Sequence, residues 1–353
     1  MIGSASELEL VCNDLHAALG FLSKLGLRLD VIYPADQPHT AILTDGGKTV
    51  RLTTHPDAGP PPGDLPAFLP EFSLTPVGGS SSDGRAGMHY RDLIPNRLGG
   101  HYIASHITIS DGGPVPDWVH FHRVAFQMIY VRKGWVRVVY EDQGEPFVLR
   151  VGDMVLQPSE IRHRVLASSP GLEVIEISCP ALHETFADHD MALPNGRDAG
   201  RKFSGQRFLR HVASETPWIP SHGGEAQETG MGDATNGLAE VRTLRPGLSS
   251  GLAFPPHDGE LVFGVVLEGS ARLHYGGIHL LGPADAFVIP PGEPWSLSDA
   301  SESLRLLQVT TARSGGKKES RVVLGDNEES TFLELHARRR GMPAFAGTTM
   351  GGQ

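Results

Sequence analysis

Two strand-rich segments of the chain repeat one pattern, and this duplication constrains the fold more than any other feature. YVRKGWVRVVY at 130–140 and VVLEGSARLHY at 265–275 share a glycine and the same alternation of apolar and polar positions. VGDMVLQPSEIRH at 151–163 and PADAFVIPPGEPW at 283–295 also match when set side by side. Alternation with a period of two is typical of β-strands. The sequence therefore predicts two similar β-domains in tandem.

The composition fits many short strands joined by turns better than long helices. The chain of 353 residues contains 43 Gly and 27 Pro, so turn-forming residues are abundant throughout. We expect a mainly β protein with two β-barrels in tandem and a small α+β module at the N-terminus.

Charge and cysteine content narrow the class further. The net charge of −11 opposes a phosphate backbone, so nucleic acid is not an expected partner. Cys12 and Cys179 are the only cysteines, which rules out a disulfide framework. No apolar run approaches the roughly 20 residues of a membrane helix, and the N-terminus lacks the pattern of a signal peptide. We expect a cytoplasmic protein with a small-molecule substrate and no membrane partner, and a homodimer is left open.

Composition shifts divide the chain into five parts. The predicted parts are a βαβββ module at 1–54, a Pro-, Gly- and Ser-rich linker at 55–87, a first barrel at 88–200, a second barrel at 201–312 and a disordered tail at 313–353.

The N-terminal module contains one predicted helix. Asn13 or Asp14 is the expected N-cap, apolar residues follow at helical spacing, and Gly26 lies shortly after the end. The βαβββ order resembles one module of the vicinal-oxygen-chelate (glyoxalase) superfamily, in which two modules pair to build a metal site. Only one copy of the module is found. The resemblance implies a metal ligand in the first strand, near Glu7, and another in the fourth strand, where this chain has Leu52.

The first barrel carries a group of candidate metal ligands. His120 and His122 stand at i and i+2 on a predicted strand and therefore point to the same side. Gln127 opens the next strand, and His163 follows the turn after it. Three imidazoles and one amide oxygen could meet in the barrel interior and bind one divalent ion.

These residues resemble the two motifs of the cupin superfamily. The first motif matches at His120, His122, Gln127 and Gly134, with Gln where the family usually has Glu. The second matches at Gly152, Pro158 and His163, with Glu160 where a second Gly is usual and Ala167 where Asn is usual. The resemblance implies a bicupin with His120, His122, Gln127 and His163 as ligands of one divalent metal, with Zn, Ni, Fe and Mn all open.

The second barrel lacks such a group. Its equivalent positions fall on Pro255, His257, Val262 and Trp295. One ligand of four does not hold a first-row ion in the usual way, so we expect a structural partner without a metal.

Three functions remain open from the sequence. A neutral amide leaves the ion its full charge, which favours Lewis-acid isomerase, cyclase or lyase chemistry on a small oxygen-rich substrate. Glu176, a carboxylate inside the apolar run LEVIEISCP, is the candidate catalytic acid or base, with an edge-strand carboxylate as the alternative. The other functions are an Fe(II)-dependent dioxygenase and a metal- or ligand-binding protein without catalysis.

Overall fold

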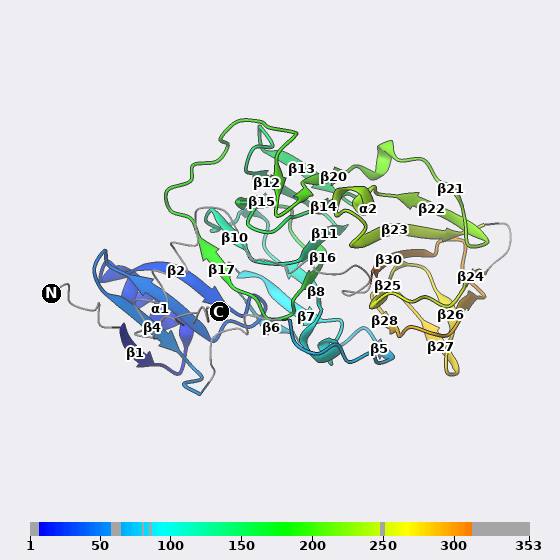
Figure 1. Cartoon of the computed structure of the whole chain (residues 1–353), viewed down its shortest axis with the longest axis horizontal. Helices are drawn as coiled ribbons and strands as arrows, with labels where there is room; N and C mark the ends of the chain where they lie inside the picture. The colour runs from blue at the N-terminus through cyan, green and yellow to red at the C-terminus, as the bar shows by residue number, and fades with distance from the viewer. Residues whose placement is uncertain (1–6, 58–64, 80, 85–86, 248–250, 313–353) are drawn as a thin grey trace, which may run out of the picture.

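The protein is mainly β and consists of a small module followed by two barrels (Figure 1). The computed structural model describes residues 7–57, 65–79, 81–84, 87–247 and 251–312. The module lies at one end, the first barrel in the middle and the second barrel at the other end. The predicted fold class is confirmed. The predicted disordered tail at 313–353 lies outside the described residues.

The N-terminal module is a four-stranded sheet covered by one helix. Its sheet has the order β1-β4-β3-β2, with β1 parallel to β4 and the other pairs antiparallel. Asp14 is the N-cap of the helix and accepts a hydrogen bond from the backbone N–H of Ala17. The elements are β1 (Glu7–Val11), α1 (Leu15–Lys24), β2 (Arg28–Tyr33), β3 (Thr40–Thr44) and β4 (Thr49–Thr53).

The first barrel encloses its interior between two sheets. One sheet has the order β17-β10-β15-β12-β13, with β9 also on β15, and the other has the order β20-β14-β11-β16-β8-β7-β6. The strands of the first sheet are β9 (Gly113–Pro114), β10 (His120–His122), β12 (Trp135–Tyr140), β13 (Phe147–Arg150), β15 (His163–Ser168) and β17 (Thr185–Ala187). Those of the second are β6 (Ser82–Asp83), β7 (His89–Asp92), β8 (Ile103–Ile109), β11 (Phe126–Lys133), β14 (Met154–Leu156), β16 (Leu172–Cys179) and β20 (Leu209–His211).

The second barrel repeats this arrangement with sheets β21-β22-β23-β30-β25-β28-β5 and β24-β29-β26-β27. Its strands are β5 (Ser73–Thr75), β21 (Ile219–Ser221), β22 (Gly224–Glu228), β23 (Ala239–Pro246), β24 (Leu252–Phe254), β25 (Leu261–Glu268), β26 (Ala271–His274), β27 (Ile278–Leu281), β28 (Ala286–Ile289), β29 (Trp295–Ser298) and β30 (Arg305–Thr311). Two smaller elements are the hairpin β18 (Lys202–Phe203) with β19 (Gln206–Arg207) and the short helix α2 (Met231–Ala234).

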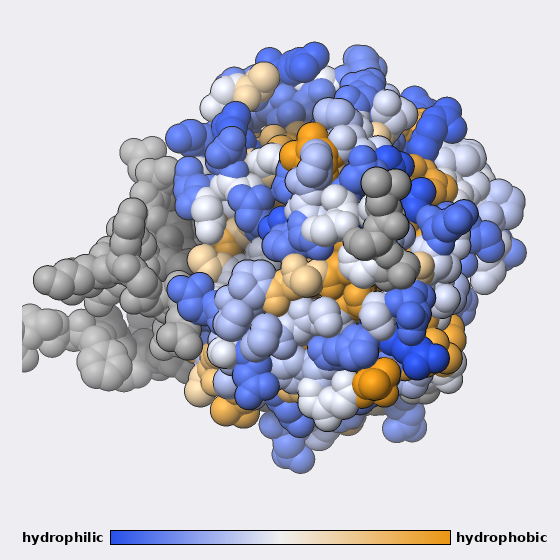
Figure 2. Space-filling model, turned by 90° about the vertical axis from the view of Figure 1, so that its right-hand side faces the viewer, coloured by the Kyte–Doolittle hydropathy of each residue, from blue (hydrophilic) through white to orange (hydrophobic). Residues whose placement is uncertain are grey.

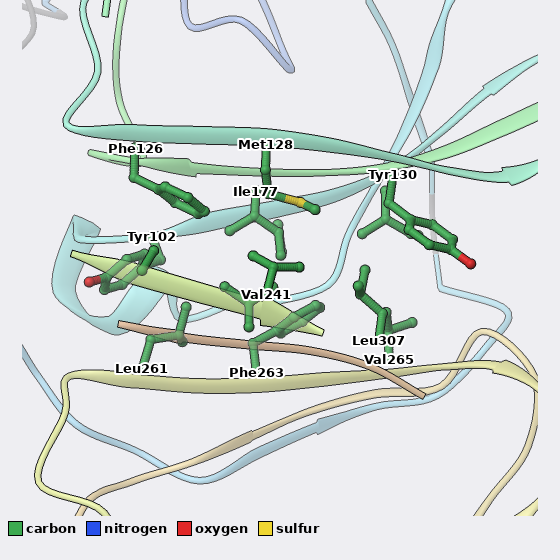
Figure 3. Close-up of a cluster of buried hydrophobic side chains, with 14 of the residues drawn as sticks. Tyr102, Phe126, Met128, Tyr130, Ile177, Val241, Leu261, Phe263, Val265 and Leu307 are labelled. Carbon is green, nitrogen blue, oxygen red and sulfur yellow. The ribbon is translucent and has the colours of Figure 1, made fainter. Parts of the chain in front are cut away.

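The largest hydrophobic cluster lies between the two barrels. Figure 3 shows Phe126, Met128 and Ile177 of the first barrel facing Phe263 and Leu307 of the second. All five are buried, with exposures of 1% or less. Strands such as β11 and β16 thus bury one face in their own barrel and the other against the neighbouring barrel, which explains their nearly continuous apolar sequence.

The structure corrects two predicted boundaries. The segment 55–87 is not a linker throughout, because β5 pairs with β28 of the second barrel and β6 pairs with β7 of the first. The boundary at 200 and 201 cuts the first barrel, because β20 pairs with β14. β5, β6 and β20 are edge strands of their sheets, and the Pro and Gly around β5 and β6 hide these two short strands in the sequence.

The module is joined to the first barrel by backbone pairing. β2 pairs with β17, with Ile32 opposite Thr185 and Val31 opposite Phe186. The sheet of the module and one sheet of the barrel therefore form one continuous sheet. The glyoxalase-like assignment of the module stays a prediction.

The far end of the second barrel has a mostly polar surface. Figure 2 views the molecule from this side and shows hydrophilic residues interrupted by scattered hydrophobic ones. Such isolated apolar side chains are normal on soluble folds. Of the helices in the described part of the chain, none has the length and apolar character to cross a bilayer.

Candidate metal centre

Three predicted histidines meet inside the first barrel. β10 places His120 and His122 on one face, and antiparallel pairing sets His163, the first residue of β15, opposite His120. One nitrogen of each ring can be chosen so that all three lie within 4.8 Å of one another. Imidazole binds first-row ions at about 2.0–2.1 Å, so small ring rotations bring the three nitrogens onto one ion.

Backbone carbonyls hold all three rings in the tautomer that a metal needs. Nδ1 of His120 donates to the carbonyl of Trp118 at 2.7 Å, and Nδ1 of His163 donates to that of Ile161 at 3.0 Å. Nδ1 of His122 donates to the carbonyl of Glu184 at 3.3 Å. Because a carbonyl can only accept, each Nδ1 carries its proton, and Nε2 is the ring nitrogen without one.

Burial makes this arrangement suitable for a cation. The exposures of His120, His122 and His163 are 0%, 6% and 6%. Three adjacent protonated imidazoles would repel one another in this low-dielectric interior, whereas three neutral ones present convergent lone pairs. Within the described residues, this is the group of His, Cys, Asp and Glu side chains with metal-site geometry. The donor set therefore fits a bound divalent ion.

Gln127 and Glu176 lie next to each other on the neighbouring strands β11 and β16. Gln127 is buried, and its Nε2 donates to Oε1 of Glu176 at 3.4 Å. Glu176 lines the same cavity as the three histidines rather than standing on an outer edge. Its carboxylate can exchange a proton with a bound molecule there. The role of Gln127 as a direct ligand stays a prediction.

The histidines open onto a cavity with mainly apolar walls. The cavity has a volume of about 70 Å³. No Lys or Arg is among the described residues that form its walls. The walls consist of Met88, Tyr90, Ile107, Ile109, His120, His122, Ile129, Val136, Val138, Tyr140, Leu149, His163, Val165, Leu172, Val174 and Glu176.

Tyr140, Gln157 and His183 also surround the centre, and the motifs did not indicate them. The ring of Tyr140 stacks on that of His163 with centroids 5.4 Å apart. Burial raises the pKa of Tyr140 well above its usual range, so its phenol stays protonated and able to donate. The ring of His183 lies 5.4 Å from that of His122, and burial lowers the pKa of His183. The only sequence signal for Gln157 is its place directly before Pro158 of the second motif.

The equivalent region of the second barrel is filled with apolar side chains. Trp295 stacks on Phe254 with ring centroids 3.8 Å apart, and both belong to the core of that barrel. Nε2 of His257 points to the carbonyl of Ile289 at 3.0 Å. Val262 is buried in the same core. In the described part of this barrel the residues at the four motif positions form no metal-site group.

Comparison with known proteins supports a cupin fold for this chain. Residues 105–177 match the family model of the cupin domain, a range that contains the three histidines, Gln127 and Glu176. No curated protein matches this chain.

Solved structures show the same fold at low sequence identity. Oxalate decarboxylase from Bacillus subtilis is 14% identical, with a TM-score of 0.50 over 71% of this chain and 78% of that one. The protein Ylba from E. coli is 12% identical, with a TM-score of 0.50 over 71% of this chain and 95% of that one. The chain therefore has a cupin fold, and its first barrel carries a cupin domain with a three-histidine centre.

Proposed function

We propose that this protein is a divalent-metal-dependent enzyme that acts on a small substrate with carbonyl, hydroxyl or carboxylate oxygens by isomerase, cyclase or lyase chemistry. The observation that carries the proposal is the position of Glu176 on the wall of the cavity into which the three histidines open. A metal centre and a proton-transferring carboxylate then face one bound molecule.

Different residues of the site would bind the metal and transfer the proton. His120, His122 and His163 would hold the ion, which would supply a Lewis acid for a carbonyl oxygen of the substrate. Glu176 removes a proton from the carbon next to the polarised carbonyl and returns it elsewhere on the substrate. The amide of Gln127 donates to Oε1 of Glu176 and so orients the carboxylate. Tyr140 supplies a protonated phenol on the wall of the same cavity.

The walls of the cavity indicate the shape of the substrate. Apart from the histidines, Glu176 and two tyrosines, the residues that line it are aliphatic or Met. Apolar walls exclude water and contribute about 25 cal/mol for each Å² of apolar surface that they cover. The metal would be the positive centre of the pocket. A fitting substrate would carry oxygens for that centre and a small apolar group for the walls.

A second candidate is an Fe(II)-dependent dioxygenase. The observation in its favour is that the clustered side chains are three neutral histidines, with no carboxylate among them. An Fe(II) ion held by these histidines would supply redox chemistry with oxygen beside an organic substrate. Oxygen consumption with the iron-loaded protein separates this candidate from the first.

The test of the first proposal is proton exchange in D₂O. Metal-loaded protein is mixed with a panel of small α-hydroxy ketones and β-hydroxy acids with alkyl side chains, and incorporation of deuterium is followed by NMR. We expect exchange with at least one probe, lost in Glu176→Gln and in His122→Ala. If exchange occurs equally in wild type and Glu176→Gln, the assigned proton transfer is wrong. If no probe exchanges while the iron-loaded protein consumes oxygen with one of them, the dioxygenase takes its place.

A further inference from the structure

We propose that Gln157 supplies a fourth protein ligand, through its side-chain amide oxygen, to the first-row divalent ion held by His120, His122 and His163. This residue lies at none of the ligand positions of the two motifs. The inference rests on the metal centre proposed above and adds a ligand to it.

The backbone fixes Gln157 beside the histidines. It follows β14 directly, and its N–H donates to the carbonyl of Gln127 at 2.8 Å, which ties it to β11. Pro158 follows and restricts the chain further. The residue is 1% exposed, so its amide has no access to bulk water. A buried amide must find its partners within the barrel.

The side chain of Gln157 reaches the ligand nitrogen of His163. An atom of its amide lies 2.8 Å from Nε2 of His163. Two ligand atoms that bind one ion at adjacent positions, each at about 2.1 Å, are separated by roughly 3 Å. The amide thus occupies the position of a neighbouring ligand. An ion bound to Nε2 of His163 must either include this amide or displace it.

The orientation of the amide depends on what it faces. With Nε2 of Gln157 turned to His163, the oxygen Oε1 is buried and has no hydrogen-bond partner. Such an orphaned buried acceptor destabilises a fold. The two amide atoms exchange places by rotation about one bond. After this rotation Oε1 faces Nε2 of His163, and a cation between them binds both lone pairs.

The two glutamines beside the centre can be told apart. Gln127 directs its Nε2 to Glu176 at 3.4 Å, whereas Gln157 directs its amide to a histidine. Both amides are neutral, so replacing either by leucine leaves the charge of the site unchanged. The matched control for Gln157→Leu is Gln227→Leu in the second barrel, because Gln227 is also buried and its amide donates to the backbone carbonyls of Ala213 and Thr216.

The test is titration of metal-free protein with Co²⁺, followed by its visible absorption and by competition with a chelator. We expect Gln157→Leu to raise the Kd about 10- to 100-fold and to change the absorption spectrum, which reports the ligand set. Gln157→Glu, which keeps an oxygen and adds a charge, lowers the Kd. Gln227→Leu leaves the Kd within about threefold of wild type. An unchanged Kd and spectrum in Gln157→Leu overturn the proposal.

Two controls make every outcome decisive. Thermal melting of the metal-free variants shows whether Gln157→Leu still folds. If it does not fold, Gln157→Glu decides alone, because a Kd no lower than that of wild type overturns the proposal. Wild type is titrated first: a failure to bind Co²⁺ there rejects the whole metal centre, which is distinct from the loss of one ligand.

Discussion

His120 and His163 lie directly opposite each other on the paired strands β10 and β15, with ring centroids 4.2 Å apart. His122 stands two residues further along β10, on the same face of the strand as His120, and joins the same cluster. Antiparallel pairing thus converts a short-range His-x-His pattern and one distant histidine into a single cluster. The candidate centre is a consequence of strand register rather than of loop conformation.

Glu176 should be needed for turnover but not for metal binding. Glu176→Gln keeps the shape of the side chain and removes its ability to take a proton. We expect turnover of an exchanging probe to fall by about 10²- to 10⁴-fold while metal content and melting temperature stay close to those of wild type. Elemental analysis and NMR exchange on the same sample check this. Loss of the metal together with turnover would instead make Glu176 a ligand.

Filling the cavity should block probes without disturbing the ion. Ile129 lies on the cavity wall and is only partly buried, so Ile129→Trp adds bulk toward the substrate. We expect weaker binding of an alkyl hydroxy ketone, by about tenfold or more, with an unchanged Co²⁺ spectrum. Ile278→Trp on the exposed strand β27 is the control. Equal probe affinities in the two variants would place the substrate elsewhere.

The cluster between the barrels should dominate stability. Phe263 is 0% exposed and belongs to this cluster. Phe263→Ala removes its contacts with the first barrel, and we expect the free energy of unfolding to fall by about 3–5 kcal/mol. Leu280→Ala, at a residue 76% exposed, should change it by less than about 0.5 kcal/mol. Urea denaturation measures both. A small effect of Phe263→Ala would mean that the barrels fold independently of their contact.

Stability should fall as the solution becomes acidic, in part through His211. Burial lowers the pKa of His211 below its ordinary 6.5, against the opposing charge of Asp153. As the pH falls through 6.5, His211 becomes protonated in the unfolded chain but stays neutral in the folded protein. The folded state therefore loses up to about 1.4 kcal/mol per pH unit from this group, between 6.5 and the lower folded pKa.

His211→Gln removes that contribution. Urea denaturation of wild type and His211→Gln at several pH values above and below 6.5 compares the two slopes of stability against pH. The other buried histidines are common to both proteins and cancel in the difference. We expect the shallower slope in the variant. Equal slopes would show that His211 does not titrate differently in the folded state.

The sequence predicted the mainly β fold and the three histidines because both depend on local periodicity. Alternation along a strand decides which side a residue faces, so the spacing of His120 and His122 is enough to place them on one face. Gln157 and Tyr140 could not be found in this way. Their closeness to His163 depends on the pairing of β12 with β15 and on the turn after β14, neither of which any spacing specifies.

The orientation of Glu176 and the strand β5 could not be read from the sequence. In β16 the residues Val174 and Glu176 line the cavity while Ile175 and Ile177 face the second barrel, so the apolar run shows no clear alternation. The orientation of Glu176 therefore stayed open at the level of sequence. The strand β5 could not be predicted because its partner β28 lies far along the chain.

The most direct test of the account is the metal content of the protein, purified without added metal and without a nickel resin. We predict about one equivalent of a first-row divalent ion in wild type and almost none in His120→Ala/His122→Ala, with both proteins folded. Iron would favour the dioxygenase, and zinc, nickel or manganese the Lewis-acid enzyme. Equal metal content in the two proteins, or no metal in wild type even after reconstitution, would contradict the proposed metal centre.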